Sequence, residues 1–372
     1  MLPQIFSAPM ADVTNPACRA LFEMHGADFT FTEMINSDGL LYGDSFANDA
    51  GFSITKKPYG IQISGNNSKS ISKAAEILED MFSPSVIDIN MGCPSPRIMR
   101  SGCGASLMND EKLASQIISD VCSVLKTPVS AKIRIFENSE KTVSFAKSLE
   151  CAGISSLAVH GRTREMFYSG TCNTKQIREI VSSLSIPVIA NGNVFDGLGA
   201  LSLINETGTS NIMIGRATIG NPFIFFKMKR FFKTAEKLGI DWQNIGPEEF
   251  KENINSKRST EKTGNLEQFS ELKQINSTIF KNVLDQTEIE QRISDFKLYC
   301  KLIEKNNLYS RINIKAHAQW FTKGFPDSCK LRLQINDLHK NIKVPLNDID
   351  ALVEDRIILS KKIIEILDER YL

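Results

Sequence analysis

Seven polar or charged residues stand at or just beyond the ends of short apolar runs, where side chains can meet a ligand. They are Glu33, Gln62, Asn90, Lys132, His160, Asn191 and Arg216. Taken singly, an amide at such a place can cap a turn, and a histidine can simply be hydrogen-bonded. An ammonium within AKIRI is harder to dismiss, because burying Lys132 is costly unless its charge is paired. Seven such residues together predict a binding site.

Glycine-rich segments after the last two apolar runs indicate an anion site. NGNVFDGLG spans 191–199 and GRATIGNP spans 215–222. Glycine lets backbone amides approach an anion, and Arg216 can grip two of its oxygens. The polar groups of the other runs suit a planar heterocycle with several polar edges, such as a flavin. A cation near the N1 and O2 edge of that ring would stabilise its anionic reduced form, a task suited to Lys132.

A cysteine in DINMGCPSPRIMRSGCGASLM (88–108) raises a separate question. Cys93 directly follows an apolar run and is either a buried structural thiol or a reactive group. The segment alone does not decide between these roles. The decision depends on what the fold places beside the thiol.

Eight short apolar runs bounded by turn residues are predicted to be strands. They span 4–10, 29–35, 59–65, 85–92, 128–135, 155–161, 187–194 and 211–217. Most connections have helical periodicity, and the exception is 39–57. Strands that alternate with helices pair in parallel, and eight of them close a (β/α)8 TIM barrel with its ligand site at the C-terminal mouth. The rival, an open doubly wound sheet, would usually carry G-x-G-x-x-G where this chain has APMADVTNPACR.

Charge and cysteine usage exclude several classes of protein. With a net charge of +1 over 372 residues, a polyanion must be held by a local basic patch. Eight scattered cysteines without a Cys-x-x-Cys pair predict a reduced protein with no metal site. The first residues lack a signal-peptide pattern, and no run approaches the ~18 apolar residues of a membrane span. We expect a cytoplasmic protein that does not contact a membrane.

The chain is predicted to have three parts. A barrel domain spans 1–233, a polar connecting tract spans 234–291 and is either a long loop or partly disordered, and an all-helical domain spans 292–372. Between 297 and 332, eight basic residues stand against two acidic ones, which makes a local basic patch. Most such runs are solvated helix faces, so the patch alone does not establish a partner.

These motifs resemble those of the tRNA-dihydrouridine synthase family. The ordered set is APM at 8–10, NPACR at 15–19, TEM at 32–34, DINMGCP at 88–94, GASLM at 104–108, KIR at 132–134, HGRTR at 160–164, YSG at 168–170, NGN at 191–193 and IGRATIGNP at 214–222. IKAHAQWFTKGFPDSCKLR, from residue 314, resembles the helical domain of the same family. The resemblance implies an FMN-binding barrel, a helical tRNA-binding domain, and reduction of uridine in tRNA with NADPH or NADH as a transient reductant.

The resemblance also implies a role for each matching residue. Cys93 is the general acid, which protonates C5 of a uracil while reduced FMN delivers hydride to C6. A thiol suits this task because it is mostly protonated at neutral pH. Contacts to the flavin ring fall on Met10, Gln62, Asn90, Lys132 and His160, with Pro9 shaping the loop, and phosphate contacts on Asn191, Gly192, Asn193, Gly215 and Arg216. Contacts to substrate and tRNA fall on Arg134, Arg162, Lys315, His317, Lys323 and Arg332.

Two other functions stay open. An FMN-dependent reductase of free pyrimidines, similar to dihydroorotate or dihydropyrimidine dehydrogenases, would share the barrel, the FMN and a catalytic thiol or hydroxyl. The basic helical domain argues against it. A non-catalytic RNA-binding protein is the second alternative, and the complete set of polar strand ends argues against that. We expect a monomer, and the sequence does not indicate which uridine is reduced.

Overall fold

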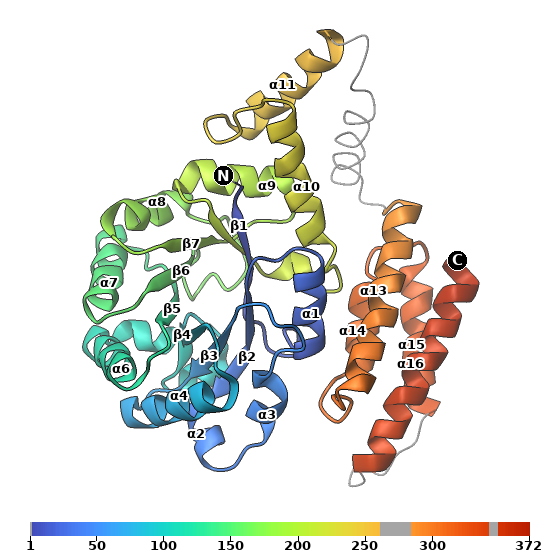
Figure 1. Cartoon of the computed structure of the whole chain (residues 1–372), viewed down its shortest axis with the longest axis horizontal. Helices are drawn as coiled ribbons and strands as arrows, with labels where there is room; N and C mark the ends of the chain where they lie inside the picture. Colours follow the sequence, from blue (N-terminus) through green and yellow to red (C-terminus); the bar gives the residue numbers. More distant parts are fainter. Residues whose placement is uncertain (1, 261–283, 342–348) are drawn as a thin grey trace.

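The structure, a computed structural model, describes residues 2–260, 284–341 and 349–372. Strands surround the centre of the N-terminal part, helices cover them on the outside, and a group of C-terminal helices lies beside the barrel (Figure 1). The predicted succession of a barrel and a helical part is confirmed.

Eight parallel strands are hydrogen-bonded in the order β1-β8-β7-β6-β5-β4-β3-β2. Their bounds are β1 (Gln4–Ser7), β2 (Thr30–Asn36), β3 (Tyr59–Ser64), β4 (Val86–Met91), β5 (Val129–Arg134), β6 (Ser156–His160), β7 (Val188–Asn191) and β8 (Asn211–Ile214). A bridge between Phe6 and Phe29, with Ser7 N donating to Phe29 O at 3.0 Å, joins the two edges of the sheet. All eight predicted strands are present, and together they form the predicted (β/α)8 barrel.

Helices connect successive strands, and many begin at an asparagine or aspartate that accepts a backbone N–H, as at Asn67 and Asp110. They are α1 (Pro16–Met24), α2 (Ser37–Leu41), α3 (Phe46–Gly51), α4 (Ser68–Phe82), α5 (Pro96–Arg100), the 3-10 helix η1 (Gly104–Asn109), α6 (Glu111–Val124), α7 (Ser139–Cys151), α8 (Thr174–Ser183), α9 (Gly197–Thr207), the 3-10 helix η2 (Arg216–Thr218) and α10 (Ile224–Lys237). The stretch without clear periodicity, 39–57, contains α3 and the end of α2, both shorter than two turns.

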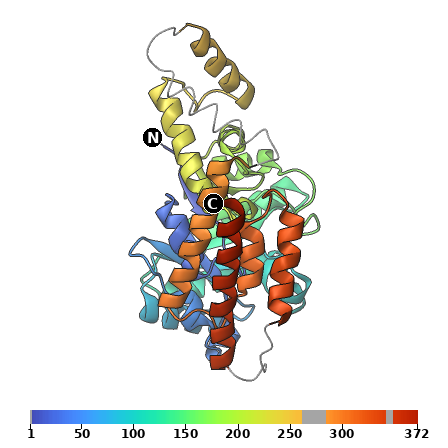
Figure 2. The same ribbon diagram turned by 90° about the vertical axis from the view of Figure 1, so that its right-hand side faces the viewer.

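The C-terminal part consists of α11 (Pro247–Thr260), α13 (Gln286–Lys305), α14 (Ile314–Phe321), α15 (Ser328–Asn341) and α16 (Ile349–Tyr371). Figure 2 shows α13 to α16, here called the helical region, as helices side by side against the barrel. Of the predicted tract 234–291, residues 261–283 lie outside the described residues. The rest of that tract holds the end of α10, α11 and the start of α13.

Apolar side chains fill the lower interior of the barrel. Ala8, Phe31, Ala158, Ile189 and Met213 form a buried cluster, with further aromatic rings packed against it. Two of its members, Ala8 and Met213, also border the space between the polar strand ends, so the cluster forms an apolar wall of that space.

Candidate active site

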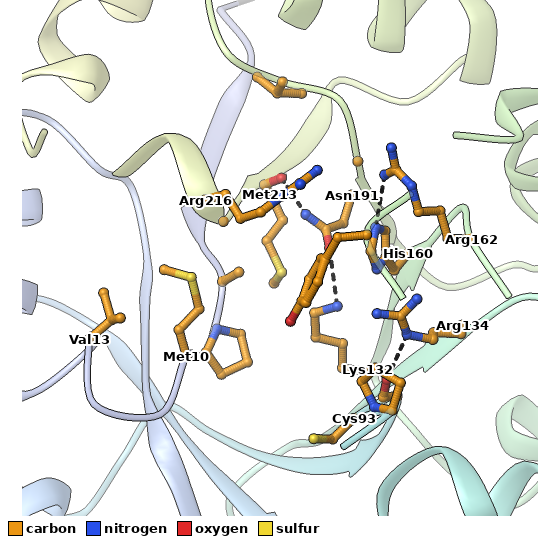
Figure 3. A pocket seen from close by; sticks show the side chains of 18 of the residues that line it. Met10, Val13, Cys93, Lys132, Arg134, His160, Arg162, Asn191, Met213 and Arg216 are labelled. Atoms are coloured by element: carbon orange, nitrogen blue, oxygen red, sulfur yellow. Dashed lines mark hydrogen bonds between the residues drawn. The ribbon is translucent and has the colours of Figure 1, made fainter. Parts of the chain in front are cut away.

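A cavity of about 510 Å³ opens at the C-terminal ends of the strands, a size typical of a site for a small molecule or cofactor. Every barrel residue predicted to bind cofactor or substrate lines it: Pro9, Met10, Gln62, Asn90, Cys93, Lys132, Arg134, His160, Arg162, Asn191, Gly192, Asn193, Gly215 and Arg216. Met10 and Val13 lie on one side, facing Arg134, His160 and Arg162 on the other (Figure 3). Residues distant in the sequence therefore share one cavity.

Glu33 is the exception among the seven polar strand-end residues. The pairing of β2 with β3 shifts register between Phe31 and Met34, and this irregularity breaks the alternation of side chains. As a result Met34 lines the cavity, whereas Glu33 borders a small cavity beside the helical region. Burial raises the pKa of Glu33 to about 7, and its Oε1 accepts from Asp12 N at 2.6 Å. The expectation that all seven converge is wrong for Glu33.

A buried hydrogen-bond chain fixes the loop that carries Cys93. Ser130 Oγ and Gln62 Nε2 donate to the two oxygens of Asp88 at 2.6 and 2.7 Å. Because Gln62 is oriented in this way, its Oε1 accepts from Asn90 Nδ2 at 2.7 Å. Asn90 Oδ1 then accepts the backbone N–H of Cys93 at 3.0 Å. The chain begins at a fully buried carboxyl, and burial raises the pKa of Asp88 to about 6.

Cys93 is half-buried and borders the cavity. Its carbonyl accepts from Ala105 N at 3.0 Å, which brings η1 close. Gly104 permits this approach, because its φ is +61° and a Cβ there would lie 2.7 Å from Cys93 O. Cys103, in the same loop, is buried, and its Sγ lies 3.5 Å from Ser101 O. Of these two cysteines, Cys93 is the one whose thiol can reach a ligand.

Lys132 places a positive charge inside the cavity. Its Nζ donates to Asn191 Oδ1 at 3.2 Å, and Asn191 Nδ2 donates to Met213 O at 2.7 Å (Figure 3). Burial, and then the charge of Arg134, lower the pKa of Lys132 to about 8. Lys132 is therefore largely protonated at neutral pH, and its ammonium group donates to the side-chain amide of Asn191.

His160 is kept neutral by its surroundings. Burial first, then the charges of Lys132, Arg134 and Arg162, lower its pKa to about 2. Arg162 Nη1 lies 3.3 Å from His160 Nε2, and since the guanidinium can only donate, Nε2 accepts. The imidazole can offer a hydrogen bond to a ligand but does not act as an acid at neutral pH.

Two arginines expected to contact substrate or tRNA also organise the loop 162–170. Arg134 Nη1 donates to two carbonyl oxygens of this loop at 2.9 and 2.8 Å. Arg162 donates from Nε and Nη2 to two others at 2.8 and 2.7 Å. The loop in turn carries Tyr168 to the cavity wall.

Arg216 marks a cationic end of the cavity. Its guanidinium lies between the rings of Tyr168 and Phe195, 5.1 and 5.6 Å from their centroids. Within the part of the chain that the structure describes, no carboxylate forms an ion pair with it. Gly192 and Asn193 have successive positive φ angles of 140° and 55°, which turn the loop after β7 along this end. An unpaired guanidinium beside such a loop suits a phosphate.

Three residues in or beside this site, Asp88, Tyr168 and Phe195, are not among the predicted site residues. Asp88 could have been predicted, because period-two alternation in the sequence places it on the same strand face as Asn90. Tyr168 and Phe195 lie in loops, whose conformation depends on the arginine contacts and not on a sequence period.

The four predicted tRNA contacts of the helical region have different surroundings. Lys323 and Arg332 are exposed and Lys315 is half-buried, and none forms an ion pair with another described residue. His317 is 2% exposed, and its Nε2 lies 3.0 Å from Asp12 O. His317 therefore faces the barrel. Because its ring is buried there, it has no access to RNA.

Among the described residues, no helix has the length and apolar character needed to cross a membrane. The same residues contain no group of three or more His, Cys, Asp or Glu side chains able to hold a metal ion.

Comparisons with known proteins point to one family. A family model described as dihydrouridine synthase matches residues 6–316. The tRNA-dihydrouridine synthase B of Xanthomonas axonopodis pv. citri is 35% identical over 242 residues, covering 63% of this chain and 72% of the relative. The enzyme of that name from Pseudomonas putida is 36% identical over 239 residues, covering 62% and 69%. A probable tRNA-dihydrouridine synthase of Aquifex aeolicus is 32% identical over 244 residues, covering 64% and 77%.

Proposed function

Because the chain belongs to the dihydrouridine synthase family, we propose that it reduces the C5–C6 double bond of specific uridines in tRNA with FMN bound in the barrel cavity. The observation that carries the proposal is the cavity itself. Among its described lining residues, four are cations, none is a carboxylate, and one is a cysteine. A site of this composition suits an anionic cofactor and a proton donor.

The chain's own residues fit FMN at both ends of the cavity. Arg216 and the glycine-containing loops after β7 and β8 would hold the phosphate, since the guanidinium has no carboxylate partner among the described residues. Gln62, Asn90 and Lys132 would meet the polar edge of the ring, with Met10 against it. His160, being neutral, adds a hydrogen bond without adding charge.

In the proposed reaction, Cys93 supplies a proton to C5 of the uracil. The hydride for C6 would come from reduced FMN held in the cavity, and NADPH or NADH, bound transiently, would supply the electrons that reduce the flavin. The thiol gives its proton to C5 as negative charge develops there, and the resulting thiolate is reprotonated from solvent. Lys132 stabilises negative charge in the cavity, while Asn90 holds the Cys93 loop in place.

Exposed cations of the helical region support tRNA as the substrate. Within the described residues, Lys301, Lys305, Lys323 and Arg332 form no ion pair and are exposed. Arg97 and Arg100, on α5, are exposed between Cys93 and Cys103 in the same loop. Positive charge is therefore available on both parts of the molecule for phosphate contacts. We further propose a monomer that acts in the cytoplasm.

The proposal is tested by offering the purified protein, with NADPH, either tRNA that lacks dihydrouridine or free uracil. We expect the protein to bind FMN and to form dihydrouridine in tRNA far faster than dihydrouracil, measured by mass spectrometry. Equal turnover of free uracil would instead indicate a reductase of free pyrimidines. Failure to bind FMN would leave a non-catalytic RNA-binding protein as the better account.

A further inference from the structure

One helix of the helical region touches two loops that form walls of the barrel cavity. We propose that α14 is a positioning element of the cofactor site, which sets the walls carrying Met10 and Arg216, so that the helical region does more than bind RNA. The inference rests on the proposed function for the identity of the cofactor. Its structural part concerns only contacts between α14 and the barrel.

The first contact is made to the loop between β1 and α1. Asp12 O accepts a hydrogen bond from His317 Nε2 at 3.0 Å, since a carbonyl can only accept. Burial lowers the pKa of His317 to about 3, so the ring is neutral at ordinary pH. Protonation therefore does not alter its hydrogen bond to Asp12 O. Met10 and Val13, on either side of Asp12, line the cavity. Through His317, α14 therefore anchors the loop at a residue that lies between two cavity-lining residues.

Asp12 itself shows why the loop needs an anchor. Its φ of 62° lies in the left-handed region, which costs free energy for a residue other than glycine. Its N–H donates to Glu33 Oε1 at 2.6 Å, and its carbonyl accepts from His317. The strained residue is thus held by the barrel through one backbone group and by α14 through the other.

A second residue of the helical region supports the same loop. Tyr299, on α13, stacks on the His317 ring with centroids 4.7 Å apart. Its hydroxyl accepts from Asn15 Nδ2 at 3.0 Å, and Asn15 is the N-cap of α1. The loop between β1 and α1 is therefore held at its middle and at its end.

The third contact is made to the loop after β8. Gly220 has a φ of +64°, and a Cβ there would lie 2.1 Å from the backbone carbon of Trp320, near the end of α14. Arg216, Ala217 and Ile219 in the same loop line the cavity. The backbone of α14 thus packs directly against the loop that carries the predicted phosphate contact.

The test measures the FMN dissociation constant by flavin fluorescence in wild type, His317→Ala, His317→Gln and Tyr299→Phe. The control is Gln319→Ala, on the same helix, whose amide bonds Asn336 at 3.0 Å within the helical region. Hydrogen exchange of residues 10–15 is followed in the same proteins without FMN.

We expect His317→Ala to weaken FMN binding roughly tenfold, the effect of one lost buried hydrogen bond. We expect His317→Gln to recover part of this loss, because its amide can still donate. Tyr299→Phe, which removes one hydroxyl and preserves the ring, should weaken binding by roughly two- to fivefold. Exchange in residues 10–15 should be faster in all three than in Gln319→Ala.

The inference is overturned if Tyr299→Phe and His317→Ala both match Gln319→Ala in FMN affinity and in exchange of residues 10–15. Where His317→Ala is poorly folded, His317→Gln takes its place for α14, and it should still bind FMN more weakly than Gln319→Ala. Tyr299→Phe keeps the packing and tests the support that α13 gives to the same loop. Wild type that binds no FMN would defeat the proposed function instead, and the exchange measurement would still test the contacts of α14.

Discussion

At the scale of single residues, the cavity gathers positive charge without matching carboxylates. Lys132, Arg134, Arg162 and Arg216 all line it, whereas the carboxyl of Asp88, whose charge acts on Lys132, does not line it and is bonded to Gln62 and Ser130. Burial keeps His160 neutral among these charges. Clustered positive charge in a partly buried cavity is costly, and an anionic ligand would offset it.

Asp88 gives a prediction for stability as a function of pH. Its folded pKa of about 6 lies above the ordinary 3.8 because of burial, so it contributes stability below about pH 4 that is lost as pH rises through 6. In Asp88→Asn the amide resembles the neutral carboxyl and can still accept from Gln62. We expect the variant to be more stable than wild type by about 1–3 kcal/mol at pH 8, and by less at pH 5.

Urea unfolding at the two pH values measures this difference, with Asp80→Asn, an exposed carboxylate on α4, as control. A wild type that is more stable than Asp88→Asn at pH 8 would contradict the assignment, since the carboxylate would then be favourable in its buried site.

At the scale of elements, the loop from β4 to η1 positions the thiol, and Gly104 allows its two halves to meet. Gly104→Ala would strain a φ of +61° and press a Cβ against Cys93 O. We expect a fall of tenfold or more in dihydrouridine formation, on the order of what a small misplacement of a reacting group costs. Gly208→Ala is the matched control.

Gly208 has a similar φ of +78° but nothing within 4 Å of an added Cβ. It should lose about 1–2 kcal/mol of stability from backbone strain alone and keep full activity. Steady-state rates together with unfolding free energies distinguish the two variants, and equal rates for both would show that Gly104 does not position the thiol.

The elements that the sequence predicts are those with a strong period. Eight apolar runs appear as eight strands, and alternation puts Asn90 and Lys132 on interior faces. The same alternation fails in β2, because the register shift before Met34 turns Glu33 away, and a bulge leaves no apolar signature. The packing of His317 against the barrel could not be predicted either, because its partner Asp12 lies 305 residues away in the chain.

At the scale of the whole molecule, the helical region has two kinds of surface, one packed against the barrel and one that carries exposed cations. One face, through His317 and Tyr299, packs against the barrel. Other positions carry exposed cations such as Lys323. Charge alone therefore does not distinguish a residue that is predicted to contact RNA, such as Lys323, from one that packs against the barrel, such as His317.

The predicted contacts between tRNA and the exposed cations of the helical region can be tested by comparing Lys323 with Lys297. Lys323 has no ion pair among the described residues, whereas Lys297 pairs with Asp368 at 2.6 Å. We expect Lys323→Ala to weaken tRNA binding several-fold and to lower the slope of log affinity against log salt by about 1. Lys297→Ala should change both less, and neither should alter FMN affinity. Salt-independent tRNA binding in filter assays would contradict the prediction that these cations contact tRNA phosphates.

The role of Cys93 is tested most directly by one comparison of dihydrouridine formation in tRNA with FMN-loaded enzymes. Cys93→Ala should bind FMN like wild type and lose on the order of 100-fold or more in dihydrouridine formation, because the proton donor to C5 is gone. Cys103→Ala, whose buried thiol does not line the cavity, should stay active. Dihydrouridine formed at the wild-type rate by FMN-loaded Cys93→Ala would contradict the account.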